Sequence, residues 1–205
     1  MLTLYVGPTA YGLQLPGGID VRPPVRRGDL RDLVRTTGPG TVAIADGTFH
    51  AYPSVGHAEI REALDAGWTV WGLCSMGAIR AAEMRHLGMR GFGAVYERYA
   101  GCDDFDDDEV ALVHQEEAPF RPLSEPLIHI REFLLSLELP EHDRILKSLK
   151  QRWYAERTLE ALRELLRETG QTDRSMAGFD AFRLKRSDLV RFLAERPWER
   201  AVPVR

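Results

Sequence analysis

The chain has 205 residues, of which 44% are hydrophobic, enough to bury the core of one domain or of one domain with an appendage. Residues 1–119 hold 10 basic and 17 acidic side chains, whereas residues 120–205 hold 17 and 14, and the net charge is −4. This balance excludes a strongly basic nucleic-acid-binding surface, and no apolar run is long enough to cross a membrane. Two cysteines and a start without a basic signal segment lead us to expect a cytoplasmic protein.

Short apolar segments in the first 119 residues predict three buried parallel strands: Leu2–Val6, Val42–Ala45 and Thr69–Leu73. Helices are predicted at about Asp29–Arg35, Val55–Ala66 and Met76–Leu87. Strands that alternate with helices indicate an α/β fold, here a small parallel sheet flanked by helices in a Rossmann-like layer. The glycine-rich residues 88–101 are expected to form a loop and a short helix.

Beyond residue 119 the pattern becomes helical. Apolar residues at helical spacing predict a helix through Leu127–Leu137, a long helix over His142–Glu168 and a last helix near Leu189–Leu193. We therefore predict an α/β core over residues 1–119 and a helical C-terminal region over residues 120–205 that packs on this core.

Ser75 is the first candidate for chemistry, because it follows the third predicted strand and opens the next helix. Its hydroxyl would lie at the carboxyl edge of the sheet, beside backbone N–H groups of the helix start. That setting suits a nucleophile whose transition state carries an oxyanion. The alternative is that Ser75 only caps the helix, and the match to Gly-x-Ser-x-Gly is imperfect because Gly72 lies three residues before it.

A serine nucleophile needs a base, and Lys185 is one of only three lysines in the chain. It shares a face with Leu189 and Phe192 if the last helix extends back to it, whereas a cap at Ser187 would leave it in an extended segment. In either case its neighbours are apolar, and desolvation lowers the pKa of a lysine unless the ammonium reaches water. His57, at the start of the helix after the second strand, is the rival base.

Three loops follow the predicted strands: Gly7–Thr9, Asp46–His57 and Gly72–Gly77. Because parallel strands end at the same edge of a sheet, these loops should converge there and form a site.

The acidic tract Cys102–Glu109 and His114 beyond it contain side chains of the types that bind metal ions. The spacing of this tract fits no calcium loop, and offsets of five and six residues to His114 do not share a helix face. We expect no metal and no cofactor.

Taken in order, the motifs of the first two thirds of the chain resemble those of the TfuA-like family. They are Gly7-Pro8-Thr9, Pro23-Pro24-x-Arg26-Arg27-Gly28-Asp29-Leu30, Ile44-Ala-Asp46-Gly47, Ser54-Val55-x-His57-x-Glu59, Ser75-Met76-Gly77-Ala78-x-Arg80, Gly88-Met89-x-Gly91 and Asp107-Asp108-Glu109.

The resemblance implies a role beside YcaO enzymes, which activate a peptide amide with ATP and install a thioamide. TfuA-like partners are understood to hydrolyse the thiocarboxylated C-terminus of a small ubiquitin-like, ThiS-type sulfur-carrier protein, to release sulfide, and to help the YcaO enzyme engage its peptide. The proposed catalytic unit of the family is a Ser–Lys pair, which falls on Ser75 and Lys185. Cys74 departs from the small or hydroxyl residue expected there, and its thiol either packs or competes as a nucleophile.

Supporting roles, including stabilisation of the oxyanion, are expected for residues near the pair: Gly7, Thr9, Asp46, His57, Met76, Gly77 and Arg80. Two other functions stay open. One is a non-catalytic adaptor that docks the carrier and the YcaO enzyme together, and the other is a general serine hydrolase of small esters or thioesters.

Overall fold

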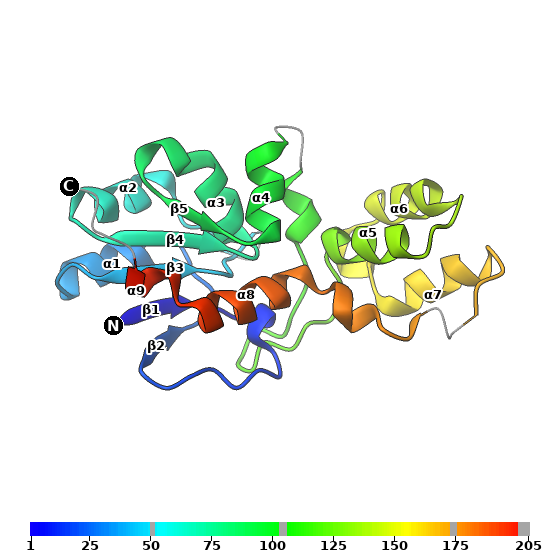
Figure 1. Cartoon of the computed structure of the whole chain (residues 1–205), viewed down its shortest axis with the longest axis horizontal. Coiled ribbons are helices and arrows are strands. Elements are labelled where there is room, and N and C mark those ends of the chain that lie inside the picture. Colours follow the sequence, from blue (N-terminus) through cyan, green and yellow to red (C-terminus); the bar gives the residue numbers. More distant parts are fainter. Residues whose placement is uncertain (50–51, 103–105, 173–175, 201–205) are drawn as a thin grey trace. The chain divides into compact units, whose positions relative to one another are not determined.

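The computed structural model describes residues 1–49, 52–102, 106–172 and 176–200 (Figure 1). The chain divides into two compact units: Met1–Phe105 together with Lys185–Arg205, and Asp106–Leu184. The predicted boundary after residue 119 differs from this division. The last helix belongs to the first unit because Leu189 and Phe192 are fully buried in the core of its sheet.

The first unit is built on a five-stranded parallel sheet in the order β2-β1-β3-β4-β5, which confirms the α/β prediction. The predicted strands correspond to β1, β3 and β4. The sequence pattern missed β2 and β5 because these edge strands are short and mostly half-buried, without an apolar run. The strands are β1 (Leu2–Tyr5), β2 (Ile19–Arg22), β3 (Thr41–Ile44), β4 (Thr69–Leu73) and β5 (Arg90–Phe92).

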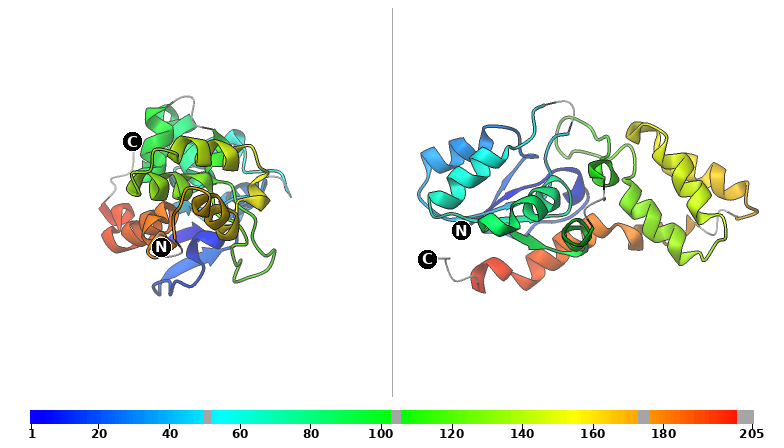
Figure 2. Two further views of the ribbon diagram at one scale, coloured as in Figure 1. Left: turned by 90° about the vertical axis from the view of Figure 1, so that its right-hand side faces the viewer. Right: turned by 90° about the horizontal axis from the view of Figure 1, so that it is seen from above.

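Helices cover both faces of this sheet, as the right-hand view of Figure 2 shows. One face packs on α1 (Asp29–Thr36), α2 (His57–Asp65) and α3 (Met76–Met84). The other packs on α8 (Leu184–Glu195) and on Trp198 of α9 (Pro197–Arg200). Because both faces are covered, neighbouring strand residues such as Val42 and Ala43 are buried on opposite sides of the sheet.

The glycine-rich residues 88–101 contain the predicted short helix, α4 (Ala94–Gly101), but the strand β5 precedes it where a loop was predicted. Gly88 and Gly93 bound the strand with φ angles of 102° and 96°, which side chains rarely adopt. At Gly91 a Cβ atom would lie 2.1 Å from the ring of Tyr96. The glycines therefore serve sharp turns and close packing.

The second unit is helical, as predicted, with α5 (Leu127–Ser136), α6 (His142–Lys150), α7 (Leu159–Arg167) and the short 3-10 helices η3 (Asp107–Val110), η4 (Tyr154–Glu156) and η6 (Phe179–Phe182). Across the described residues of both units, no helix has the length and apolar composition needed to cross a membrane.

The single long helix predicted over His142–Glu168 is wrong, because the chain breaks between α6 and α7. The buried guanidinium of Arg157 donates to the carbonyl groups of Leu149, Lys150 and Arg152 and so satisfies the end of α6. The Thr158 hydroxyl then accepts from the N–H of Ala161 and caps the start of α7.

Candidate active site

The loops after β1 and β3 meet at the carboxyl edge of the sheet, where Tyr5, Ile44 and Gly72 are aligned as register partners. The buried Asp46 carboxylate joins them: it accepts from the N–H groups of Gly7 (2.9 Å) and Thr9 (3.0 Å), and from the Thr9 hydroxyl (2.7 Å). The order of the sheet reverses between β1 and β3, which is where doubly wound folds place ligands.

A strained turn carries the chain from β4 into α3. Cys74 has a φ of 64°, and the N–H of Ser75 donates to the carbonyl groups of Leu73 (2.7 Å) and Ala45 (3.1 Å). The bond to Leu73 closes a three-residue γ-turn, a conformation that costs free energy in a residue other than glycine. The turn therefore places Ser75 rigidly beside the end of β3.

Glycines make this close crossing of strand and helix possible. A Cβ atom at Gly72 would lie 2.0 Å from the carbonyl oxygen of Gly77, and one at Gly77 would lie 1.7 Å from that of Ile44. No side chain fits at either position unless the start of α3 moves away from the sheet.

Ser75 occupies the N-cap position of α3, but its side chain makes no capping hydrogen bond. The first intrahelical donors are the N–H groups of Ala78 and Ile79, which both bond to the carbonyl of Ser75. The N–H groups of Met76 and Gly77 precede these donors and lie where a helix start binds negative charge. The hydroxyl is thus not committed to the cap, and oxyanion donors are adjacent to it.

Lys185 lies in the first turn of α8, so the helix extends back to it and Ser187 does not begin the helix. Its Nζ atom is 3.8 Å from Oδ1 of Asp46, and both side chains are only 3% exposed. Burial favours the neutral amine, whereas the carboxylate favours the ammonium. The structure therefore brings Lys185 to the edge of the sheet that carries Gly7, Thr9 and Asp46.

The pKa of the Cys74 thiol depends on its burial and on the charged side chains near the turn. The pKa of its thiol is raised well above 9.0, first by burial and then by the carboxylates of Asp188 and Asp46, while Lys185 acts in the opposite direction. A fully buried thiol held in its neutral form is a poor nucleophile. The thiol of Cys74 therefore packs in the core beneath the turn.

Asp188 is a residue of this region to which the sequence analysis assigned no role. Its buried carboxylate accepts from the N–H groups of Ala94 and Val95, both at 2.9 Å, and so caps α4. A Cβ atom at Gly93 would lie 2.3 Å from the Asp188 carboxyl carbon. The position of Asp188 one turn after Lys185 in α8 is the sequence signal that could have found it.

His57 and Arg80 contact Glu83, and both were predicted to support the site at Ser75. Nε2 of His57 lies 2.8 Å from Oε2 of Glu83, about two turns along α3 from Ser75, and the His57 side chain is 56% exposed. Arg80 donates to the carbonyl of Val55 and to Glu83. These contacts tie the start of α2 to α3 and do not place His57 as a base for Ser75.

In the acidic tract, residues 103–105 lie outside the described residues. Asp108 forms an ion pair with Arg157 and Glu109 with Arg131, each at 2.6 Å. In the described parts of the chain, no group of three or more histidine, cysteine or acidic side chains is arranged to hold a metal ion.

A family model described as TfuA-like protein matches residues 46–158, which is more than half of the chain. The matched range includes Asp46, Ser75 and Arg80 and ends before Lys185. A search of the curated proteins finds no match. TfuA-like proteins are associated with YcaO enzymes in thioamidation. The match confirms the resemblance seen in the motifs, and the chain belongs to the TfuA-like family.

Proposed function

We propose that this protein hydrolyses the thiocarboxylated C-terminus of a ubiquitin-like sulfur-carrier protein and supplies the sulfide to a YcaO enzyme for peptide thioamidation. The observation that carries the proposal is the buried pair of Lys185 and Asp46 at the sheet edge where the strained turn presents Ser75. A serine, an amine and a carboxylate that orients the amine form the usual set of groups for activating a hydroxyl nucleophile.

In the proposed first step, Oγ of Ser75 attacks the carbonyl carbon of the thiocarboxylate, and the neutral amine of Lys185 takes the hydroxyl proton. The N–H groups of Met76 and Gly77 stabilise the oxyanion that develops. The C–S bond then breaks, and sulfur leaves as hydrosulfide with the proton returned by Lys185. Water hydrolyses the acyl-serine, so the carrier departs with an ordinary carboxylate.

Asp46 has a positioning role in this scheme. Its two oxygen atoms already accept hydrogen bonds from Gly7 and Thr9, which stabilise the carboxylate and share its negative charge. The attraction between this carboxylate and Nζ of Lys185, 3.8 Å from Oδ1, helps to position the amine. Asp188 fixes the same helix one turn further on, through its bonds to the start of α4.

A non-catalytic adaptor for the carrier and the YcaO enzyme is the second candidate. The burial of Ser75 favours it, because a residue only 2% exposed meets no substrate until its neighbours move. The hydrolase proposal accordingly requires that binding of the carrier tail uncovers the hydroxyl.

The test is to incubate the isolated protein with a thiocarboxylated carrier and to measure sulfide together with the mass of the carrier. The hydrolase proposal expects catalytic sulfide release and a carrier with a normal carboxylate. An adaptor would give neither without the YcaO enzyme. A general serine hydrolase would instead turn over small esters at least as well as the carrier.

A further inference from the structure

Two adjacent arginines lie on the surface beside the candidate site. Arg26 and Arg27 follow β2, and both side chains are exposed. The N–H of Val25, the residue before them, donates to the carbonyl of Asp46 at 3.0 Å. Val25 also packs in the same buried cluster as Met76, the first residue of α3. These two residues, called the arginine pair below, are therefore next to the edge of the sheet that carries the proposed site.

Contacts to the loop after β3 hold the arginine pair in place. The N–H of Arg27 donates to the carbonyl of Pro53 (2.9 Å), and its side-chain Nε donates to the carbonyl of Ser54 (3.3 Å). The guanidinium carbon of Arg26 lies 3.6 Å from the centre of the Tyr52 ring, a separation typical of stacking. A stacked guanidinium keeps the N–H groups in its plane available to acceptors.

The carboxylates closest to the arginine pair serve backbone groups. Asp29 accepts from the backbone N–H of Arg26 at 2.7 Å. Glu59 accepts from the N–H groups of Gly28 (2.9 Å) and Gly56 (2.8 Å). Within the described residues, neither guanidinium of the pair forms an ion pair with a carboxylate. Both positive charges are thus available to a partner.

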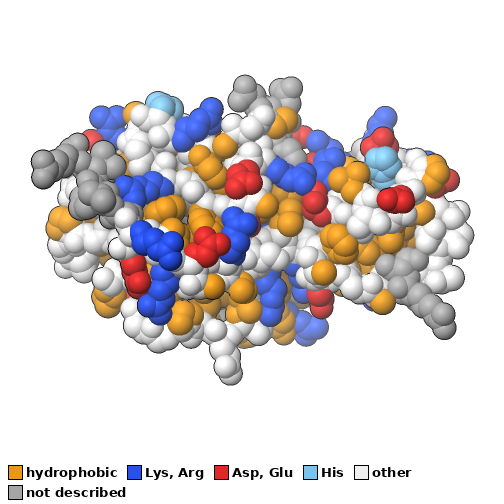
Figure 3. Space-filling model, viewed as in Figure 1, with side chains coloured by type: hydrophobic (Ala, Val, Ile, Leu, Met, Phe, Trp, Pro, Cys, Tyr) orange, Lys and Arg blue, Asp and Glu red, His pale blue; other side chains and the backbone are white. Residues whose placement is uncertain are grey.

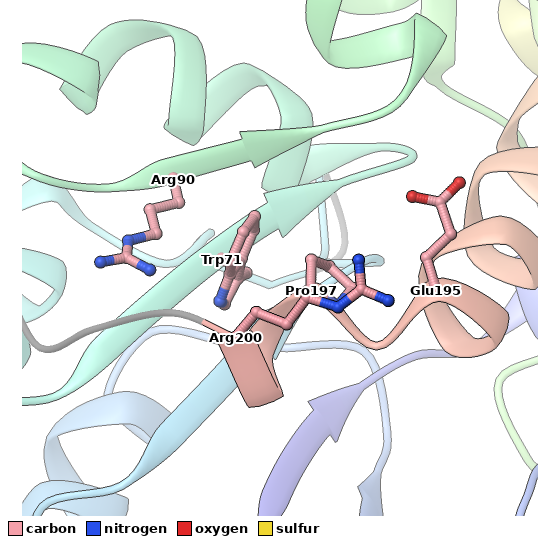
Figure 4. Close-up of a pocket in the computed structure, with 5 residues that line it drawn as sticks. All are labelled: Trp71, Arg90, Glu195, Pro197 and Arg200. Carbon is pink, nitrogen blue, oxygen red and sulfur yellow. The ribbon is translucent and has the colours of Figure 1, made fainter.

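Several arginines elsewhere in the first unit have acidic neighbours. Arg61 forms an ion pair with Asp65 on α2. On the face of the first unit drawn in Figure 3, basic and acidic side chains lie beside one another. The pocket in Figure 4 contains Arg90 and Arg200 but also the carboxylate of Glu195. The arginine pair differs from these positions in its charge and in its place beside the site.

We infer that the arginine pair is the docking surface for an acidic face of the sulfur-carrier protein, an inference that rests on the proposed hydrolysis. Ser75 is buried, so only the narrow tail of the carrier can reach it, and the folded body of the carrier stays at the surface. Two exposed guanidiniums bind carboxylates of that body through charged hydrogen bonds. Residues 1–119 hold 10 basic and 17 acidic side chains, so an acidic partner is attracted only locally, which fixes its orientation.

The test measures the binding of a labelled ThiS-type carrier that ends in an ordinary carboxylate, by fluorescence anisotropy at low ionic strength. The protein with Arg26→Gln and Arg27→Gln together should bind about tenfold more weakly, as expected for two exposed charge pairs. This difference should shrink as salt is added. The matched control, Arg35→Gln with Arg61→Gln, removes two exposed charges from α1 and α2 and should keep the affinity.

A second double variant separates charge from local structure. Arg26→Lys with Arg27→Lys alters the contacts to Tyr52 and Ser54 but keeps both charges, so its affinity should stay within about threefold of the original. The inference is wrong if the carrier does not bind, if the glutamine variant binds it normally, or if the lysine variant or the control is equally weakened. A glutamine variant that loses only the YcaO enzyme would assign the surface to that partner and would also overturn the inference.

The outcome is independent of the chemistry, because this carrier has no thiocarboxylate to hydrolyse. Normal sulfide release with unchanged docking in the glutamine variant would overturn the docking surface alone. Weakened docking in a protein that releases no sulfide would overturn the hydrolase proposal alone. If both hold, the glutamine variant should raise KM for sulfide release far more than it lowers kcat, since docking precedes the chemistry.

Discussion

Nζ of Lys185 lies 3.8 Å from Oδ1 of Asp46, and both side chains are almost completely withdrawn from water. A buried pair of this kind is costly to desolvate, and breaking it by removing one partner costs more still. Asp46 also holds the loop of Gly7 and Thr9 through three hydrogen bonds. One carboxylate therefore connects the loop after β1 and the base proposed for Ser75.

Asp46→Asn should lower both stability and activity. The amide keeps one acceptor oxygen but presents an NH₂ group to donors of Gly7 or Thr9, and it removes the carboxylate that positions Lys185. We expect the free energy of unfolding to fall by about 1–3 kcal/mol, measured by urea denaturation. The exposed Asp65→Asn is the matched control and should change it by less than about 0.5 kcal/mol. Equal effects of the two substitutions would show that the Asp46 contacts contribute little.

Lys185→Met should abolish sulfide release while the protein stays folded. Methionine fills a similar volume, and the N–H groups of Gly7 and Thr9 still bind the Asp46 carboxylate, so the protein should lose stability without losing its fold. Lys147→Met, on an exposed position of α6, is the control and should keep the original rate. A folded Lys185→Met protein with full activity would exclude Lys185 as the base.

The two cysteines should differ in reactivity. Burial raises the pKa of the Cys74 thiol well above 9.0, whereas Cys102 is exposed. Since the thiolate is the reactive form, iodoacetamide near neutral pH should add one carbamidomethyl group to the native protein, at Cys102. Denatured protein should add two, as mass spectrometry would show. Rapid modification of Cys74 in the native protein would reopen its role as a nucleophile.

We predict that the contribution of Asp188 to stability decreases as pH rises. Burial raises the pKa of its carboxyl group above 3.8, partly offset by the N–H groups of Val95 and Ala94. The folded protein then binds the proton more tightly than the unfolded chain, so this group's contribution to stability falls as pH rises from 3.8 to the raised pKa.

Asp188→Asn cannot titrate, so the deficit in its free energy of unfolding relative to the unaltered protein should be largest at acidic pH. It should shrink as pH rises through this window and then stay constant. Urea denaturation at a series of pH values measures the difference, and Asp65→Asn serves as the exposed control. A deficit that grows with pH would mean that the N–H donors outweigh burial.

The sequence allowed the strands β1, β3 and β4 and the helices that follow β3 and β4 to be predicted, because each combines an apolar segment with a clear turn signal. It also placed Ser75 between β4 and α3. The contacts of Asp188 could not be predicted from the sequence, since its partners Ala94 and Val95 lie more than 90 residues earlier in the chain.

One error and one choice that the sequence left open have local physical causes. The helical periodicity of residues 142–168 runs through the break between α6 and α7, where the buried Arg157 side chain binds the carbonyl groups at the end of α6. For Lys185, the sequence allowed two alternatives: a helix that begins at Ser187, or a longer helix that includes Lys185. The longer helix forms in the structure, where Lys185 finds a buried carboxylate in Asp46.

The most direct test of the central claim is the rate of sulfide release from a thiocarboxylated carrier by the Ser75→Ala protein. We predict a loss of about 1,000-fold or more, because removal of the nucleophile ends covalent catalysis. Ser136→Ala, which removes a hydroxyl from α5 in the second unit, should keep the original rate. A folded Ser75→Ala protein that releases sulfide as fast as the unaltered protein would contradict the proposed mechanism.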